Sequence, residues 1–130
     1  MRTLRIAAAA CLAVVGYIHA DLYVHGYRVI PFVGTAFLVQ ASASFAVALL
    51  LFVGAVVTVE PWALRLVAAL LAAGALAGFA ASRTVGVFGF VERGLQPSPQ
   101  ALLSVLAETG VLVLLGATTV RSRRARRYGA

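Results

Sequence analysis

The sequence predicts an all-α fold: a polytopic membrane protein built as a bundle of four transmembrane helices, with both termini in the cytoplasm. The first observation is composition, because 62% of the 130 residues are hydrophobic, only 12% are charged, and the mean hydropathy is +0.99. A soluble domain has about 45–50% apolar and about 25% charged residues. So few charges cannot cover the surface of a soluble chain of this length, and we therefore predict a multi-pass protein of the plasma membrane.

The second observation is a set of four charge-poor segments, each long enough for the roughly 20 apolar residues that a transmembrane helix needs. They cover residues 4–23, 32–59, 63–82 and 99–120. Together with their short connections these spans use nearly the whole chain. We therefore predict a single four-helix domain, followed by a basic tail at residues 121–130.

The third observation is the position of the basic residues, which are all arginines and give a net charge of +7. Five of them follow the last span: Arg121, Arg123, Arg124, Arg126 and Arg127. An even number of spans puts both termini on one side, and clustered arginine favours the cytoplasm, where the tail would bind anionic lipid headgroups. No aromatic residues alternate with this cluster as in strand-binding proteins, so nucleic acid is not expected as a partner.

The first segment has a second interpretation. Arg2 and Arg5, followed by an apolar run that ends in Ile-His-Ala, also resemble a cleavable signal peptide. No polar region separates this run from the hydrophobic chain that follows, which favours a transmembrane span.

Polar side chains gather toward the external ends of the predicted spans. The candidates for a polar pocket there are His19, Asp21, Gln40, Ser44, Glu92, Ser104 and Glu108. At ~1.5 Å per residue, Glu108 lies about 13 Å along its helix from Pro99, within the outer half of the bilayer. An ionisable side chain at this depth is costly unless it is paired or protonated, so Glu108 is expected to face the bundle interior.

His19 is the predicted partner of Glu108, and the two would share a proton near neutral pH. A purely structural hydrogen bond from Glu108 to Gln40 or Ser44 is the alternative. Other polar residues have simpler interpretations. Three tyrosines fit an aromatic belt at the interface: Tyr17, Tyr23 and Tyr27. Three residues fit solvated loop positions: Asp21, His25 and Arg28. Arg83, at a span end, fits snorkelling.

The connection at residues 83–98 combines apolar residues with three glycines. We expect it to fold back as a lid on the outer end of the bundle and to carry Glu92 over the polar cluster. A segment lying on lipid headgroups is the equally open alternative.

Gly74, Gly78 and Ser82 recur at four-residue spacing in the third span. Small residues in this pattern predict a close approach of another helix. Packing within this chain is favoured, and contact with a second copy or with a partner membrane protein stays open.

The sequence contains no metal-binding motif, and it names no cofactor. His19 and His25 are six residues apart, which on a helix places them on faces about 120° apart, so one ion cannot be held by both without unwinding. A site for a hard ion at His19, Asp21, Glu92 and Glu108 remains an open alternative.

The segments GYRVIPFVGTAFLVQ and RTVGVFGFVERG, with the later LLSVLAE, resemble small four-span integral membrane proteins of high-GC bacteria. The resemblance implies a fold and a lineage, without an activity. We therefore predict a non-enzymatic accessory or binding protein for a membrane partner or lipid. The alternatives are a small-solute or proton-coupled transporter that uses Glu108 and His19, and a metal-, haem- or quinone-binding enzyme.

Overall fold

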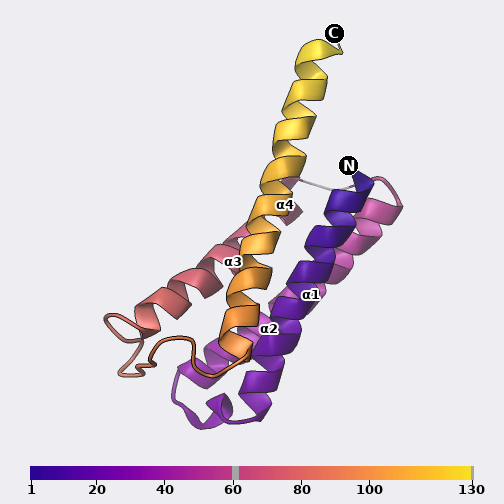
Figure 1. The fold of residues 1–130 in the computed structure, drawn as a ribbon. Helices are drawn as coiled ribbons and strands as arrows, with labels where there is room; N and C mark the ends of the chain where they lie inside the picture. The colour runs from indigo at the N-terminus through magenta and orange to yellow at the C-terminus, as the bar shows by residue number, and fades with distance from the viewer. Residues whose placement is uncertain (60–61, 130) are drawn as a thin grey trace.

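A computed structural model describes residues 1–59 and 62–129, and these residues form four long helices (Figure 1). They are α1 (Arg2–Val24), α2 (Val33–Val56), α3 (Trp62–Ser82) and α4 (Gln100–Tyr128), with a short 3₁₀-helix η1 (Tyr27–Val29) between α1 and α2. Within the described ranges no β-strand occurs, apart from one isolated bridge. All four long helices are apolar and long enough to cross a membrane. The predicted all-helical, four-helix fold is therefore confirmed.

The helices begin and end within three residues of the predicted spans, except at the end of α4. There the helix continues through the arginine cluster to Tyr128. Arginine is a good helix former, and positive charge is favourable near a helix C-terminus, so nothing in this run stops the helix. The basic segment is a helical extension that projects beyond the rest of the bundle (Figure 1).

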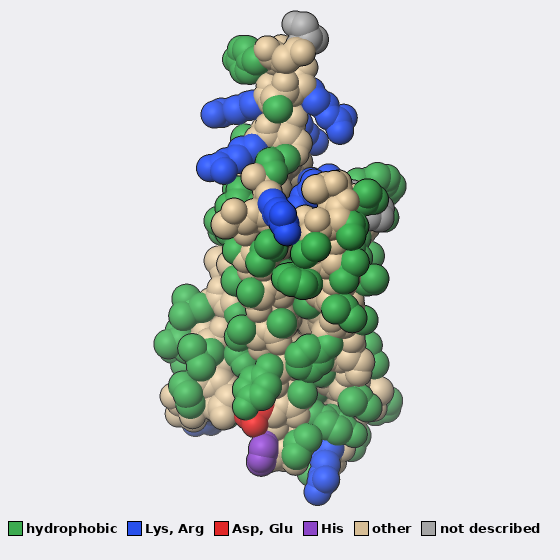
Figure 2. All heavy atoms as spheres, turned by 90° about the vertical axis from the view of Figure 1, so that its right-hand side faces the viewer, with side chains coloured by type: hydrophobic (Ala, Val, Ile, Leu, Met, Phe, Trp, Pro, Cys, Tyr) green, Lys and Arg blue, Asp and Glu red, His purple; other side chains and the backbone are tan. Residues whose placement is uncertain are grey.

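The two termini lie at the same end of the bundle, whereas η1 and the connection between α3 and α4 lie at the other (Figure 1). Between these ends the surface in Figure 2 is covered largely by hydrophobic side chains, and the coloured charged side chains lie toward the two ends. Leu49, Leu70 and Leu106 are examples of large apolar side chains that are exposed along the spans. A surface of this kind fits lipid far better than water.

The best-packed contact joins α1 to α2. A Cβ atom added at Gly16 would lie 3.2 Å from the ring of Phe45 and 3.3 Å from the carbonyl oxygen of Ala41. A Cβ atom at Gly34 would lie 2.6 Å from the carbonyl oxygen of Tyr27, so η1 rests directly on the first turn of α2. Because Gly34 has no side chain, η1 can lie this close to α2, and this contact sets the position of Tyr27.

Helix α3 is packed much less closely than α1. In its most apolar stretch 11% of the residues are buried, compared with 39% in α1. A Cβ atom at Gly74 or Gly78 would meet no atom within 4 Å, so the expected close contact of this face with a helix of the same chain is not formed. Ser82, the third member of the pattern, is buried and donates a hydrogen bond to the carbonyl oxygen of Phe79 at 2.9 Å.

Candidate functional site

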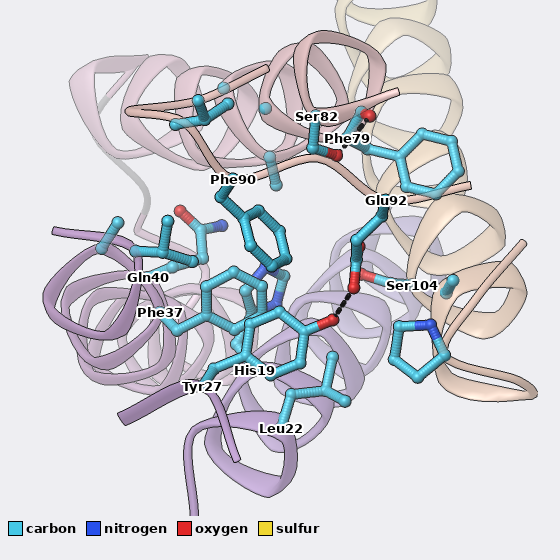
Figure 3. A pocket seen from close by; sticks show the side chains of 18 of the residues that line it. His19, Leu22, Tyr27, Phe37, Gln40, Phe79, Ser82, Phe90, Glu92 and Ser104 are labelled. Atoms are coloured by element: carbon cyan, nitrogen blue, oxygen red, sulfur yellow. Dashed lines mark hydrogen bonds between the residues drawn. The ribbon is translucent and has the colours of Figure 1, made fainter. Parts of the chain in front are cut away.

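A cavity of about 190 Å³ lies at the loop end of the bundle, and all four long helices, η1 and the 83–99 loop contribute to its lining (Figure 3). Five of the seven predicted pocket residues line it: His19, Gln40, Glu92, Ser104 and Glu108. Asp21 and Ser44 do not. Most other lining residues are aliphatic or aromatic, so the cavity is an apolar space with a few polar groups.

Aromatic rings form a continuous wall of this cavity. The ring of Phe37 lies 4.9 Å from the imidazole of His19 and 4.5 Å from the ring of Tyr27, and Tyr27 meets the edge of Phe90 at 5.6 Å, measured between centroids. Figure 3 shows these four side chains grouped on one side of the pocket. Tyr27 thus belongs to the site, whereas Tyr17 is exposed as a belt residue would be. The sequence interpretation missed Tyr27, because only the close approach at Gly34 turns it inward.

Glu92 closes the loop end of the cavity together with Tyr27 and Arg83. The Tyr27 hydroxyl donates a hydrogen bond to Glu92 Oε1 (Figure 3). Arg83 Nη2 lies 3.1 Å from Glu92 Oε2. The guanidinium also donates to the backbone oxygen of Gly94 and lies over the ring of Phe79, 3.7 Å from its centroid. We call the side chains of Tyr27, Arg83 and Glu92 the cap.

The cap explains the fold of the 83–99 loop. Val87, Phe90 and Glu92 face the cavity, as expected for a lid, and the amide of Glu92 donates to the carbonyl oxygen of Ser82 at 2.9 Å. Val85 and Phe88 are 88% and 78% exposed, so the other face of the loop keeps the apolar surface expected of a segment lying on headgroups. Arg83, interpreted from sequence as a snorkelling residue, is instead the cation of the cap.

Burial raises the pKa of Tyr27, and the hydrogen bond to Glu92 and its negative charge add to the effect, while Arg83 opposes it. The phenol is therefore protonated at neutral pH and available as a donor to Glu92. The cap holds one donor, one anion and one cation that satisfy each other.

Glu108 is the most deeply buried polar group of the site, with 1% of its surface exposed. The Ser104 hydroxyl donates to its Oε1 atom at 2.6 Å, and its Oε2 atom has no hydrogen-bond partner. Neither alternative partner bonds Glu108: the amide of Gln40 donates to the carbonyl oxygen of Leu71, and Ser44 does not line the cavity, its hydroxyl being buried without a partner. Ser104, one turn earlier on the same helix, is thus the only residue among those described that bonds Glu108.

His19 is also buried, and its Nδ1 atom lies 2.9 Å from the carbonyl oxygen of Val15. A carbonyl oxygen only accepts, so Nδ1 carries the proton of this bond and Nε2 is left as the second ring nitrogen. Across the described part of the chain, no hydrogen bond or ion pair connects His19 with Glu108. The predicted pair is not formed: Nδ1 of His19 bonds its own helix, and the imidazole lies tilted against the ring of Phe37.

The residues proposed for a hard-ion site are separated by their own partners. Asp21 forms an ion pair with His25 at 3.1 Å and accepts a hydrogen bond from Gln100 at 3.5 Å, outside the cavity. Glu92 is engaged in the cap. In residues 1–59 and 62–129, no group of three or more His, Cys, Asp or Glu side chains is arranged to hold a metal ion.

The cavity is open on its α2–α3 side. Ala36 of α2 and Gly74 and Gly78 of α3 line it and are themselves exposed. All three lie within the membrane-spanning helices, while the cap covers the loop end. The exposed part of the cavity lining therefore lies on candidate membrane-spanning helices and not in the cap.

Compared with known proteins, the chain matches no protein-family model, no curated protein and no solved structure. The resemblance to small four-span proteins of high-GC bacteria stays a prediction, and the function has to be argued from the site itself.

Proposed function

We propose that this protein is a non-enzymatic binding protein of the plasma membrane, with its termini in the cytoplasm, that holds a lipid-soluble ligand in the cavity. The observation that carries the proposal is the side opening between α2 and α3, flanked by the exposed small residues Ala36, Gly74 and Gly78. A ligand dissolved in the bilayer reaches such an opening without crossing water. The arginine-rich end of α4 would hold this orientation by binding anionic headgroups.

The size of the cavity limits the ligand. An enclosed apolar cavity of about 150 Å³ binds benzene, and typical pockets for drug-sized molecules measure about 300–1,000 Å³. At about 190 Å³, this cavity accommodates one ring or a short stretch of chain. The rest of a larger lipid would extend through the side opening into the bilayer.

The proposal is tested by native mass spectrometry of the protein purified in mild detergent, followed by extraction and identification of any bound lipid. Gly78→Leu places a side chain in the cavity opening, and we expect it to lose the bound molecule. Gly116→Leu is the matched control, since Gly116 also has open space around it but lies on α4 outside the cavity. A bound molecule that both variants retain would contradict the proposal. The same spectra report whether the protein is a homo-oligomer or carries a partner subunit.

Proton-coupled transport is the second candidate, and the unpartnered Oε2 atom of Glu108 favours it, because a lone carboxyl in a spanning helix is a common proton carrier. Proteoliposomes loaded with a pH-sensitive dye test it. Acidification driven by an imposed proton gradient should be lost in Glu108→Gln and kept in Asp21→Asn, whose side chain lies outside the cavity. Equal proton flux in wild type and Glu108→Gln would exclude this candidate.

A further inference from the structure

We infer that the cavity selects a ring that carries a hydroxyl group, that is, a phenol-like ligand or the phenol-like end of a larger lipid. The inference rests on the proposed function and specifies the chemistry of its ligand. Two independent features support it: the unused hydrogen-bonding atoms deep in the cavity, and the shape and composition of its walls.

The unused polar atoms are mainly acceptors. Glu108 Oε2 is buried without a partner, and with the proton of His19 on Nδ1, which bonds Val15, Nε2 is an acceptor. The Gln40 amide donates one of its two N–H groups to the carbonyl oxygen of Leu71, and its side-chain oxygen is a further acceptor. All three residues line the cavity. A ligand that donates a hydrogen bond would satisfy groups that the protein leaves unsatisfied, and unsatisfied buried groups are costly.

A hydroxyl is the donor that fits Glu108 in either of its states. It donates to a carboxylate, and it accepts from a protonated carboxyl group while donating to another acceptor such as His19. An amine cation fits only the carboxylate, and a carbonyl fits only the protonated acid. The hydroxyl therefore requires no particular charge on Glu108, and it enters a low-dielectric space as a neutral group, at a much smaller desolvation cost than an ion.

The walls favour a flat ring. His19, Phe37, Tyr27 and Phe90 present stacked and edge-on rings along one side, and aromatic pairs gain energy beyond the area that they bury. On α3 the lining consists of small residues, among them Gly74 and Gly78, which have no side chains to fill the space. A single ring matches the volume left between these walls.

The test uses the full-length protein in lipid nanodiscs and fluorine NMR with three probes of similar size: 4-fluorophenol, 4-fluorotoluene and 4-fluorobenzaldehyde. Empty nanodiscs and Gly78→Leu nanodiscs correct for partition into lipid. We expect 4-fluorophenol to bind the wild-type protein roughly tenfold more tightly than 4-fluorotoluene, the ratio that one satisfied buried hydrogen bond supplies. Glu108→Leu should bring 4-fluorophenol down to the affinity of 4-fluorotoluene, while Asp21→Asn should leave the ratio unchanged.

The comparison of probes on the wild-type protein does not depend on any variant folding. Equal corrected binding of 4-fluorophenol and 4-fluorotoluene would overturn the hydroxyl inference while keeping the proposed binding function. Tighter binding of 4-fluorobenzaldehyde would likewise overturn it, in favour of an acceptor ligand. If none of the three probes binds above the Gly78→Leu level, the inference fails, and an empty protein in the native mass spectra would show that the proposed function fails with it.

Discussion

The glycines of α1 and α2 and the glycines of α3 do opposite things in this bundle. A Cβ atom at Gly34 would collide with the backbone of η1 at 2.6 Å, and one at Gly16 would lie in tight contact with the ring of Phe45 at 3.2 Å. At Gly74 and Gly78 it would meet nothing within 4 Å. Small residues in membrane helices thus remove side-chain volume, and the surrounding elements decide whether a close contact or a cavity results.

The difference divides the molecule into a closely packed side and an open side. On the packed side, η1 and α2 hold Tyr27 and Phe37 in one stack. On the open side, α3 supplies a wall that contains Gly74 and Gly78. It is connected to the rest of the site by the bond from Gln40 to the carbonyl oxygen of Leu71 and, at the loop end, by the cap, in which Arg83 follows the end of α3. The packed side positions the rings, and the open side leaves room for a ligand.

The largest expected effect comes from Gly34→Ala, which tests the packed side. Because the added methyl group would lie 2.6 Å from a backbone oxygen, η1 must shift, and overpacking of this kind costs about 1–3 kcal/mol in the free energy of unfolding. Titration with denaturing detergent, followed by circular dichroism, measures the change. Gly116→Ala is the control, since its methyl group enters open space. Wild-type stability in Gly34→Ala would show that η1 is not held against α2.

An intermediate effect, on the pH dependence of stability, is expected at the cap, which links the two sides. The pKa of Tyr27 is raised in the folded protein, so the unfolded chain loses this proton first, near the usual pKa of about 10. The contribution of Tyr27 to stability is complete below that pH and is lost as the pH rises above it. Spectroscopic titration of tyrosinate should therefore show one late tyrosine that is missing in Tyr27→Phe.

Glu92→Gln sharpens the same measurement. It removes the negative charge beside the phenol and leaves Arg83 in place, so the pKa of Tyr27 should fall toward its ordinary value while burial keeps part of the shift. His25→Gln is the control, because its ion pair with Asp21 lies outside the cap. An unchanged titration in Glu92→Gln would mean that Tyr27 and Glu92 do not interact in the folded protein.

The four helices could be predicted from the sequence, because a run of roughly 20 apolar residues is by itself the signature of a membrane-spanning helix. Five of the residues that the sequence placed at the outer ends of the spans line the cavity, as expected where an ionisable group in a span faces inward, and their role as a site stays a prediction. The partner of each group was not predictable. His19 and Glu108 share a cavity without bonding each other: Nδ1 of His19 bonds Val15 and Oε1 of Glu108 bonds Ser104, each within its own helix, while Glu108 Oε2 has no partner.

The positions of Tyr27 and Arg83 in the cap were also not predictable from the sequence. Their place in the cap depends on a loop brought back from residue 92, a contact 65 positions away from Tyr27 in the chain. No local pattern encodes such a contact. At Gly74 and Gly78 no atom of this chain lies within 4 Å of an added Cβ atom, and the four-residue spacing alone does not reveal whether a second copy or a partner lies there instead.

The smallest expected effect comes from Gly74→Ala, and its sign decides what the open side is for. With nothing within 4 Å, the methyl group should be tolerated and should raise the free energy of unfolding by about 0.4–1 kcal/mol, because alanine has fewer unfolded conformations to lose than glycine. If this face were instead covered by a second copy of the chain, the same methyl group would push the two helices apart and weaken the dimer. Detergent titration together with the oligomeric state from native mass spectrometry separates the two cases. A stabilised variant with an unchanged oligomeric state favours a cavity wall open to lipid. A destabilised variant that loses a dimer would mean that a second copy of the chain covers Gly74 and closes the cavity opening. The glycines of α3 would then serve close packing, as Gly16 and Gly34 do.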